Sequence, residues 1–164
     1  MILDYNARSL KCVLALLAIL AGAASPAAAQ FSFEAQVIRV TDGDTLSVRA
    51  GDRNFRVRLH GVDAPERGQA YGTKARDFLA ELVAGQAATL RVMDVDRYGR
   101  LIALVFIGAT QVNLELLRSG MAWHYTEYDG TAAFAAAEAA ARAERRGLWA
   151  EPEPEAPWEF RRRD

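Results

Sequence analysis

Between Phe33 and Leu59, apolar side chains recur at every second position in three short runs. This is the period of β-strands that bury one face. Turn-forming residues, including Thr41–Asp44 and Ala50–Asp52, separate the runs. The pattern predicts three antiparallel strands in a meander, at Phe33–Val40, Leu46–Val48 and Phe55–Leu59.

An amphipathic helix is predicted after the meander. Thr73 is a suitable N-cap and Gly85 a suitable left-handed stop. Apolar residues between them fall on one helical face: Ala75, Phe78, Leu79 and Leu82. Because only one side is apolar, we expect the helix to pack on that side alone.

Two further strands follow. Leu90 and Val92 belong to a fourth strand, and a turn at Tyr98–Gly99 comes next. The unbroken apolar run Leu101–Ile107 predicts a fifth strand that is fully buried.

The remaining elements are helical. We predict a short helix at Asn113–Arg118 and an Ala-rich helix at Thr131–Arg146 that Gly147 stops. Five strands, an inserted helix and two terminal helices predict an α+β fold that is mainly β. The expected architecture is a five-stranded barrel of the OB type with three α-helices.

The N-terminus predicts an export signal. Basic residues precede an apolar run from Cys12 to Ala24, which is shorter than the roughly 20 residues that span a bilayer. Small residues then favour cleavage after Ala29, and a permanent membrane anchor is the alternative. We expect a signal peptide at residues 1–29, a folded domain at 30–150 and a Pro/Glu-rich tail at 151–164. The mature form is then periplasmic or secreted, outside the membrane.

Charge and composition limit the function. The chain has 20 Lys+Arg and 21 Asp+Glu residues, so it has no basic surplus to attract nucleic acid. Beyond the signal only Lys74 is a lysine, and the other cations are arginines, which bind phosphate through paired hydrogen bonds. One Cys and two His leave no ligand set for zinc or for haem attachment. A metal ion must therefore be held by oxygen.

Two acidic pairs stand at the ends of predicted strands. Asp42 and Asp44 lie in the first turn, and Asp63 and Glu66 follow the third strand. Carboxylates from two loops plus a backbone carbonyl form half the oxygen shell of a hard cation, which leaves room for water and a phosphate. Either pair alone is more often an ordinary turn.

Arginines accompany these acids. Arg58 lies on the polar face of the third strand, close to the Asp63 loop, although alone it is equally well explained as a surface ion pair. The segment Asp96–Arg100 is a third polar cluster, which by itself is a turn with solvated charges.

The order and spacing of the set resemble the staphylococcal nuclease, or thermonuclease, family. Asp-Gly-Asp-Thr alone is a weak motif, but three such segments in order on a predicted five-stranded barrel are not expected by chance. The resemblance covers about residues 33–150. The matching segments are Val40–Thr45, Arg56–Glu66, Asp96–Arg100, Val112–Asn113, Arg118–Gly120 and Gly147–Trp149.

The resemblance implies a calcium-dependent endonuclease that hydrolyses DNA and RNA and leaves 3′-phosphates. It assigns the calcium ligands to Asp44, Asp63 and the main-chain carbonyl of Ala64. Asp42 matches a supporting acid.

The resemblance also implies catalytic roles. Glu66 matches the general base for the attacking water, and Arg58 and Arg100 match the guanidinium groups that hold the phosphate. Tyr98 matches a substrate-contacting tyrosine. These roles agree with elementary chemistry, because displacement at a phosphodiester adds negative charge that cations stabilise.

The sequence departs from the family's reference member in three ways. Ala64 replaces a Thr but keeps the carbonyl, so we expect metal binding to survive. The mature domain is slightly acidic instead of Lys-rich, which predicts weaker or more salt-sensitive capture of substrate. The second base-stacking tyrosine falls at Thr126, which leaves Tyr125 or Tyr128 as its replacement.

Other residues have structural interpretations. We expect His60 and His124 to be satisfied in the fold, and Trp123, Trp149 and Trp158 to pack. The proline-rich segment 151–157 predicts extended chain, followed by a solvated tail at Arg161–Arg163.

Two other functions fit parts of the pattern. An OB barrel can bind single-stranded nucleic acid without cutting it. An exported barrel can also bind calcium or a polyanionic saccharide in the cell envelope. We favour the nuclease because a binder does not require all the acids and arginines. We expect a monomer that acts on DNA and RNA, single-stranded regions first.

Overall fold

The computed structural model describes residues 31–163, so the expected export signal at residues 1–29 lies outside the described residues. Between Phe31 and Arg163, no helix is long and apolar enough to cross a bilayer.

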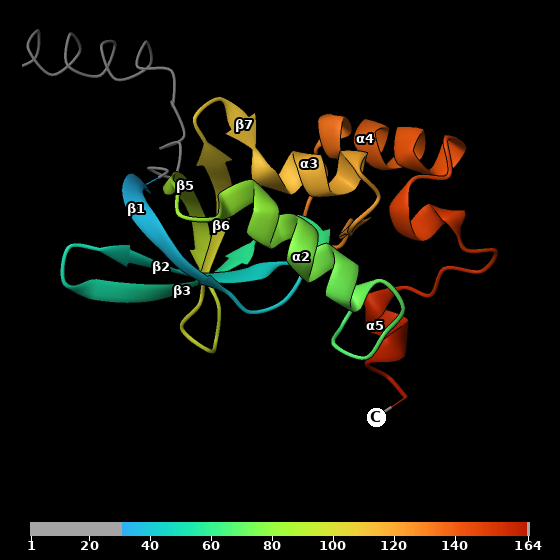
Figure 1. The fold of residues 1–164 in the computed structure, drawn as a ribbon, viewed down its shortest axis with the longest axis horizontal. Coiled ribbons are helices and arrows are strands. Elements are labelled where there is room, and N and C mark those ends of the chain that lie inside the picture. Colours follow the sequence, from blue (N-terminus) through green and yellow to red (C-terminus); the bar gives the residue numbers. More distant parts are fainter. Residues whose placement is uncertain (1–30, 164) are drawn as a thin grey trace, which may run out of the picture. The chain divides into compact units, whose positions relative to one another are not determined.

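A closed β-barrel forms the centre of the described chain (Figure 1). Its strands pair in the order β3-β2-β1-β5-β6, and parallel pairing of β3 with β6 closes the ring. This confirms the expected five-stranded barrel. The bounds are β1 (Phe31–Val40), β2 (Thr45–Ala50), β3 (Arg53–Leu59), β5 (Ala87–Val95) and β6 (Leu101–Ile107).

Shorter elements surround the barrel. Strand β7 (Thr110–Gln111) continues the sheet beyond β6, and β4 (Val62–Asp63) pairs with β8 (Trp123–His124). The helical elements are α2 (Gly72–Val83), α3 (Val112–Arg118), α4 (Ala132–Ala143), the 3₁₀ turn η1 (Gly147–Ala150) and α5 (Pro157–Phe160).

The barrel interior follows from the alternation of the strands. Leu46 and Val48 of β2 are fully buried, as are Val57 of β3 and Leu90 of β5. The expectation that β6 is fully buried is wrong, because only its Ala103 and Val105 are buried. The other five residues of β6 are half-buried, since they lie at the strand ends or on its outer face, although Leu101, Leu104 and Ile107 still pack against the core.

Helix α2 starts differently from the prediction. Thr73 is not its N-cap; the cap is Tyr71 in a left-handed conformation (φ 67°), and no side chain caps the helix. The reason is tertiary, because a Cβ on Gly72 would lie 2.0 Å from the carbonyl oxygen of Glu66. The chain turns sharply there to place α2 against the Glu66 loop. At the other end, Gly85 (φ 63°) is left-handed as predicted.

Helix α4 also ends earlier than the pattern predicts. It stops at Ala143, and Arg145 instead of Gly147 is the first left-handed residue (φ 54°). The Arg146 N–H donates to the carbonyl of Ala141 (2.9 Å), which closes the helix one turn before the predicted stop. Gly147 packs against the backbone of Gly120, where a Cβ would lie 2.2 Å from the Gly120 oxygen.

Asn113 joins three segments of the fold and is fully buried. Its Nδ2 donates to the carbonyl oxygens of His60 (2.9 Å) and Ala103 (3.2 Å), and its Oδ1 accepts from the Val105 N–H (2.9 Å). Helix α3 is thereby fixed to β6 and to the turn after β3.

Replacing Asn113 with Ala should lower the free energy of unfolding by about 2–4 kcal/mol, because the Val105 N–H and the His60 carbonyl lose their side-chain partner, whereas the Ala103 carbonyl keeps the His60 N–H. Urea denaturation of the purified domain measures the change. Asn54→Ala is the matched control, since Asn54 is exposed and its side chain accepts only from Nε of Arg49. Equal stability of both variants would contradict the role of Asn113.

Candidate active site

The first acidic loop, residues 41–44, packs directly on the second, residues 64–66. Gly43 permits this approach, because a Cβ there would lie 2.6 Å from the Cβ of Ala64 and 2.8 Å from that of Ala75. Asp44 then accepts a hydrogen bond at Oδ2 from the Ala64 N–H (2.9 Å). Asp42 caps the same turn, its Oδ1 accepting from the Asp44 N–H (3.2 Å).

Arg58 joins the carboxylates of the two loops. From β3, its guanidinium forms an ion pair with Asp44 through Nη1 and donates from Nη2 to Oδ1 of Asp63 (2.7 Å). Asp63 lies on β4 and is fully buried, and Asp44 is 4% exposed. Two buried carboxylates therefore converge on one planar cation.

The charges of this cluster shift its acid–base properties. Burial alone would lower the pKa of Arg58, but the charges of Asp44 and Asp63 outweigh it and raise that pKa. Burial, with the neighbouring negative charge of Asp44, raises the pKa of Asp42. The cluster thus keeps Arg58 charged and makes further negative charge costly.

Arg161 from the C-terminal segment completes the cluster, and the prediction of a solvated tail is wrong for this residue. Its guanidinium donates to Oδ1 and Oδ2 of Asp63 (3.2 and 2.8 Å) and to Oε1 of Glu66 (2.6 Å). No local sequence motif predicts this contact, because nearly a hundred residues separate Arg161 from its partners.

Arg100 and Tyr98 lie apart from the cluster. Asp96 holds Arg100 through its Nε (2.6 Å) and its backbone N–H (2.9 Å). Arg100 directly precedes β6, and Ile102 of β6 pairs with Arg58 of β3, so Arg100 lies at the start of the strand next to the one that carries Arg58. Tyr98 is 64% exposed and stacks with Arg97.

Asp96 is the centre of this hairpin. Desolvation works to raise the pKa of its carboxyl, but hydrogen bonds from Arg100 and Tyr98 outweigh it and lower that pKa. The ionised carboxylate therefore fixes Arg100 at the start of β6.

Asp44 and Asp63 present carboxylate oxygens, the ligand type that a hard cation prefers, and these oxygens accept from Arg58, Arg161 and the Ala64 N–H. Within residues 31–163, no group of three or more His, Cys, Asp and Glu side chains forms a metal centre. A cation at this point would therefore also need carbonyl, water or phosphate oxygens, as the sequence predicts.

Aromatic residues border the acidic cluster. The ring of Tyr125 stacks on Trp158 with centroids 5.5 Å apart and an interplanar angle of 10°. Burial, and next the negative charge of Asp63, raises the pKa of Tyr125. The sequence left Tyr125 and Tyr128 as alternatives for the second base-stacking tyrosine. Tyr125 is the one that lies against Trp158 beside the acidic cluster, whereas Tyr128 is 62% exposed and packs edge-on against Tyr125.

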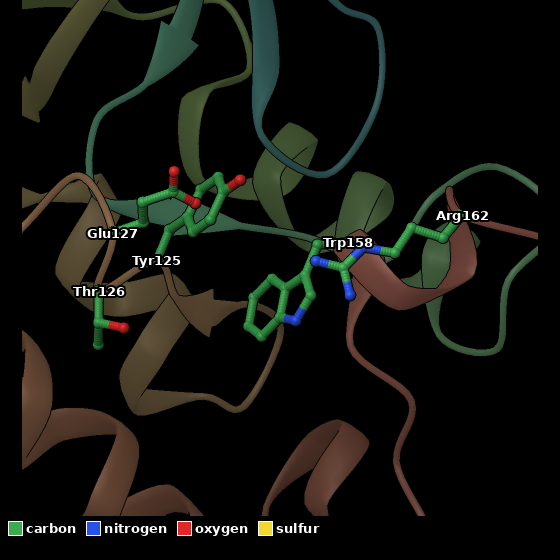
Figure 2. Close-up of a pocket in the computed structure, with 5 residues that line it drawn as sticks. All are labelled: Tyr125, Thr126, Glu127, Trp158 and Arg162. Atoms are coloured by element: carbon green, nitrogen blue, oxygen red, sulfur yellow. The ribbon is translucent and has the colours of Figure 1, made fainter.

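A surface pocket of about 260 Å³ opens beside these rings (Figure 2). Figure 2 shows Trp158 and Arg162 of the C-terminal segment facing residues of the loop after β8. That loop contributes Tyr125, Thr126 and Glu127.

The two histidines are satisfied within the fold, as predicted. The Nε2 atoms of His60 and His124 lie 3.2 and 3.0 Å from the carboxylate of Asp129. Asp129 also accepts from the backbone and hydroxyl of Thr131, at the start of α4. The three tryptophans pack as expected, with Trp123 edge-on to both Trp149 and Trp158.

Known proteins are similar to this chain over most of the described domain. A family profile described as "Staphylococcal nuclease homologue" matches residues 56–151. A micrococcal nuclease of Shigella flexneri is 40% identical over 141 residues, which are 79% of this chain and 81% of that protein. An uncharacterized endonuclease of Escherichia coli is 38% identical over 129 residues, 78% of this chain and 84% of that protein.

A plant protein shows the same likeness in a longer chain. The probable staphylococcal-like nuclease CAN1 of Oryza sativa subsp. japonica is 41% identical over 110 residues, which are 67% of this chain and 33% of that protein. The present chain matches about a third of that relative.

Gly43→Ala should lower the free energy of unfolding by about 1–3 kcal/mol, because the added Cβ overlaps Ala64 and Ala75. Chemical denaturation measures the loss. Gly130→Ala is the matched control, since a Cβ there meets nothing within 4 Å and should change stability by less than about 0.5 kcal/mol. If both variants behaved alike, the two acidic loops would not be packed as described.

Proposed function

Because the chain belongs to the staphylococcal nuclease homologue family, we propose that it is a calcium-dependent nuclease that hydrolyses phosphodiester bonds. We propose DNA and RNA as substrates, with single-stranded regions favoured and 3′-phosphate products. The observation that supports this most is the convergence of Asp44, Asp63 and Arg58, with Glu66 joined to them through Arg161.

Asp44, Asp63 and the carbonyl of Ala64 are the proposed calcium ligands. When bound there, calcium supplies positive charge that stabilises the phosphoryl oxygens of the substrate. Asp42 supports the site by holding the Asp44 backbone, since its carboxylate accepts from the Asp44 N–H. The chemistry of this donor set is that of a hard cation with an incomplete protein shell.

The proposed catalytic residues act directly on water and phosphate. The Glu66 side chain is 37% exposed, and its carboxylate is proposed to accept a proton from an attacking water. The guanidinium groups of Arg58 and Arg100 are proposed to donate to phosphate oxygens, where charge grows in the transition state. Tyr98 is exposed at the hairpin that carries Arg100 and is proposed to contact substrate.

The proposal extends to the location of the protein. Residues 1–29 are proposed to direct export, with a monomeric mature protein in the periplasm or outside the cell. The basis is the basic and apolar pattern of these residues, followed by the small residues up to Ala29.

Glu66→Gln should lower the cleavage rate by about a hundredfold or more, because the amide cannot accept the proton. Purified residues 30–164 are incubated with heat-denatured DNA and with RNA, in calcium or in chelator. Glu81→Gln is the matched control, since Glu81 is an exposed residue of α2. Cleavage should require calcium and persist in the control.

An absence of cleavage by folded wild-type protein in calcium, manganese and magnesium would overturn the proposed activity. Retained binding of single-stranded DNA would then identify a binding module, and calcium-dependent stability without DNA binding would identify an envelope protein.

Arg58→Gln should destabilise the metal-free domain by about 3–5 kcal/mol, because the buried carboxylates of Asp44 and Asp63 lose their shared cation. Added calcium should raise the thermal midpoint of this variant more than that of the wild type, since the ion replaces the lost charge. Calorimetry with and without calcium measures both effects. Equal calcium-induced shifts in variant and wild type would contradict the proposed ligands.

A further inference from the structure

We infer that Arg161 is a positioning residue of the active site, which fixes the carboxylates of Glu66 and Asp63 relative to each other. The inference rests on the proposed nuclease function. It concerns the C-terminal segment beyond residue 151, the end of the region that the family profile matches.

The segment that carries Arg161 is packed into the domain. Ala156 and Pro157 are buried, and Pro157 begins the helical turn α5. Trp158 of this turn stacks on Tyr125 and meets Trp123 edge-on. The backbone that carries Arg161 therefore has a fixed position, unlike that of a solvated tail.

Gln69 ties the same segment to the Glu66 loop. Its Oε1 accepts from the Glu66 N–H (2.9 Å), and its Nε2 donates to the Glu155 carbonyl (2.8 Å). Gln69 is 8% exposed, so water does not easily replace these bonds. Figure 1 accordingly shows α5 beside the loop that precedes α2.

Arg161 makes the second link between the two segments. It donates to both oxygens of Asp63 and to one oxygen of Glu66, so a single planar group sets the spacing of two carboxylates. Within residues 31–163, Arg161 is also the only ion-pair partner of Glu66. Without it the exposed Glu66 side chain is free to adopt other rotamers.

Charge balance supports a contribution to activity. The carboxylates at the site, those of Asp42, Asp44, Asp63 and Glu66, face the guanidinium groups of Arg58 and Arg161. A divalent cation brings this sum to zero, so the negative charge that grows on the phosphoryl oxygens in the transition state meets no net repulsion. Without Arg161 the sum stays negative, in a domain that has no basic surface excess to compensate.

The test combines calcium binding with cleavage in Arg161→Gln. Calorimetric titration with calcium chloride, without substrate, should show that the variant binds calcium at least about threefold more tightly than the wild type, because Arg161 no longer occupies the Asp63 oxygens. Cleavage of heat-denatured DNA should show kcat lowered by about tenfold to a hundredfold with KM changed little, since Glu66 loses its fixed position. Arg163→Gln is the matched control: it removes an equal charge that is paired with Glu155 instead.

Opposite shifts of the two readouts are therefore the expected result. If calcium affinity and cleavage both rose, the segment would be an inhibitory cover, and the inference would be wrong. If neither changed, Arg161 would be an inert surface residue. A raised KM with unchanged kcat would make it a substrate contact instead of a positioning residue.

Arg161→Lys carries the test if the Gln variant does not fold, because Lys keeps the charge but cannot bridge both carboxylates. Its kcat should lie below that of the wild type, and a wild-type value would overturn the inference. Failure of the proposed function is recognised separately, since the wild type would then not cleave, whereas the calcium titration still reports on Arg161.

Discussion

The burial of two carboxylates next to each other is the constraint around which this structure is arranged. Asp63 is fully buried and Asp44 almost so, and isolated ionised groups in such positions are strongly unfavourable. Arg58 balances them because β3 places its guanidinium between the two loops. The closed barrel matters for this reason, since pairing of β3 with β6 fixes where Arg58 lies. A hard cation adds charge of the sign that these carboxylates require.

The C-terminal segment is part of the same electrostatic arrangement. Arg161 shares Oδ1 of Asp63 with Arg58, donates also to Oδ2, and binds Glu66. The position of Arg161 depends on apolar packing, because Trp158 of α5 stacks on Tyr125. Stacking of aromatic rings, an interaction without charge, thereby determines where a charge is placed.

The sequence predicts what depends on local pattern. Alternation identifies β1 to β3, and Gly85 ends α2 where predicted, because these features depend on neighbours in the chain. The start of α2 at Gly72 depends instead on close packing against the Glu66 loop, and α4 ends where Arg145 adopts a left-handed conformation that its residue type does not indicate. For the site, spacing indicates Asp44, Asp63 and Arg58. It cannot indicate Arg161 or Gln69, since their partners are far along the chain or are backbone atoms.

The acidic balance of the domain bears on how substrate is captured. Arg58, Arg100 and Arg161 are each paired with carboxylates, so little of their charge is available to attract a polyanion from a distance. Under the proposed function, binding of the substrate must then depend on short-range contacts that form when these ion pairs open. Tyr98, the proposed substrate contact, is exposed with Arg97 and Arg100 beside its ring, and base stacking does not require a long-range field. Under the proposed function, short-range contacts at the site therefore replace the attraction that a basic surface would supply.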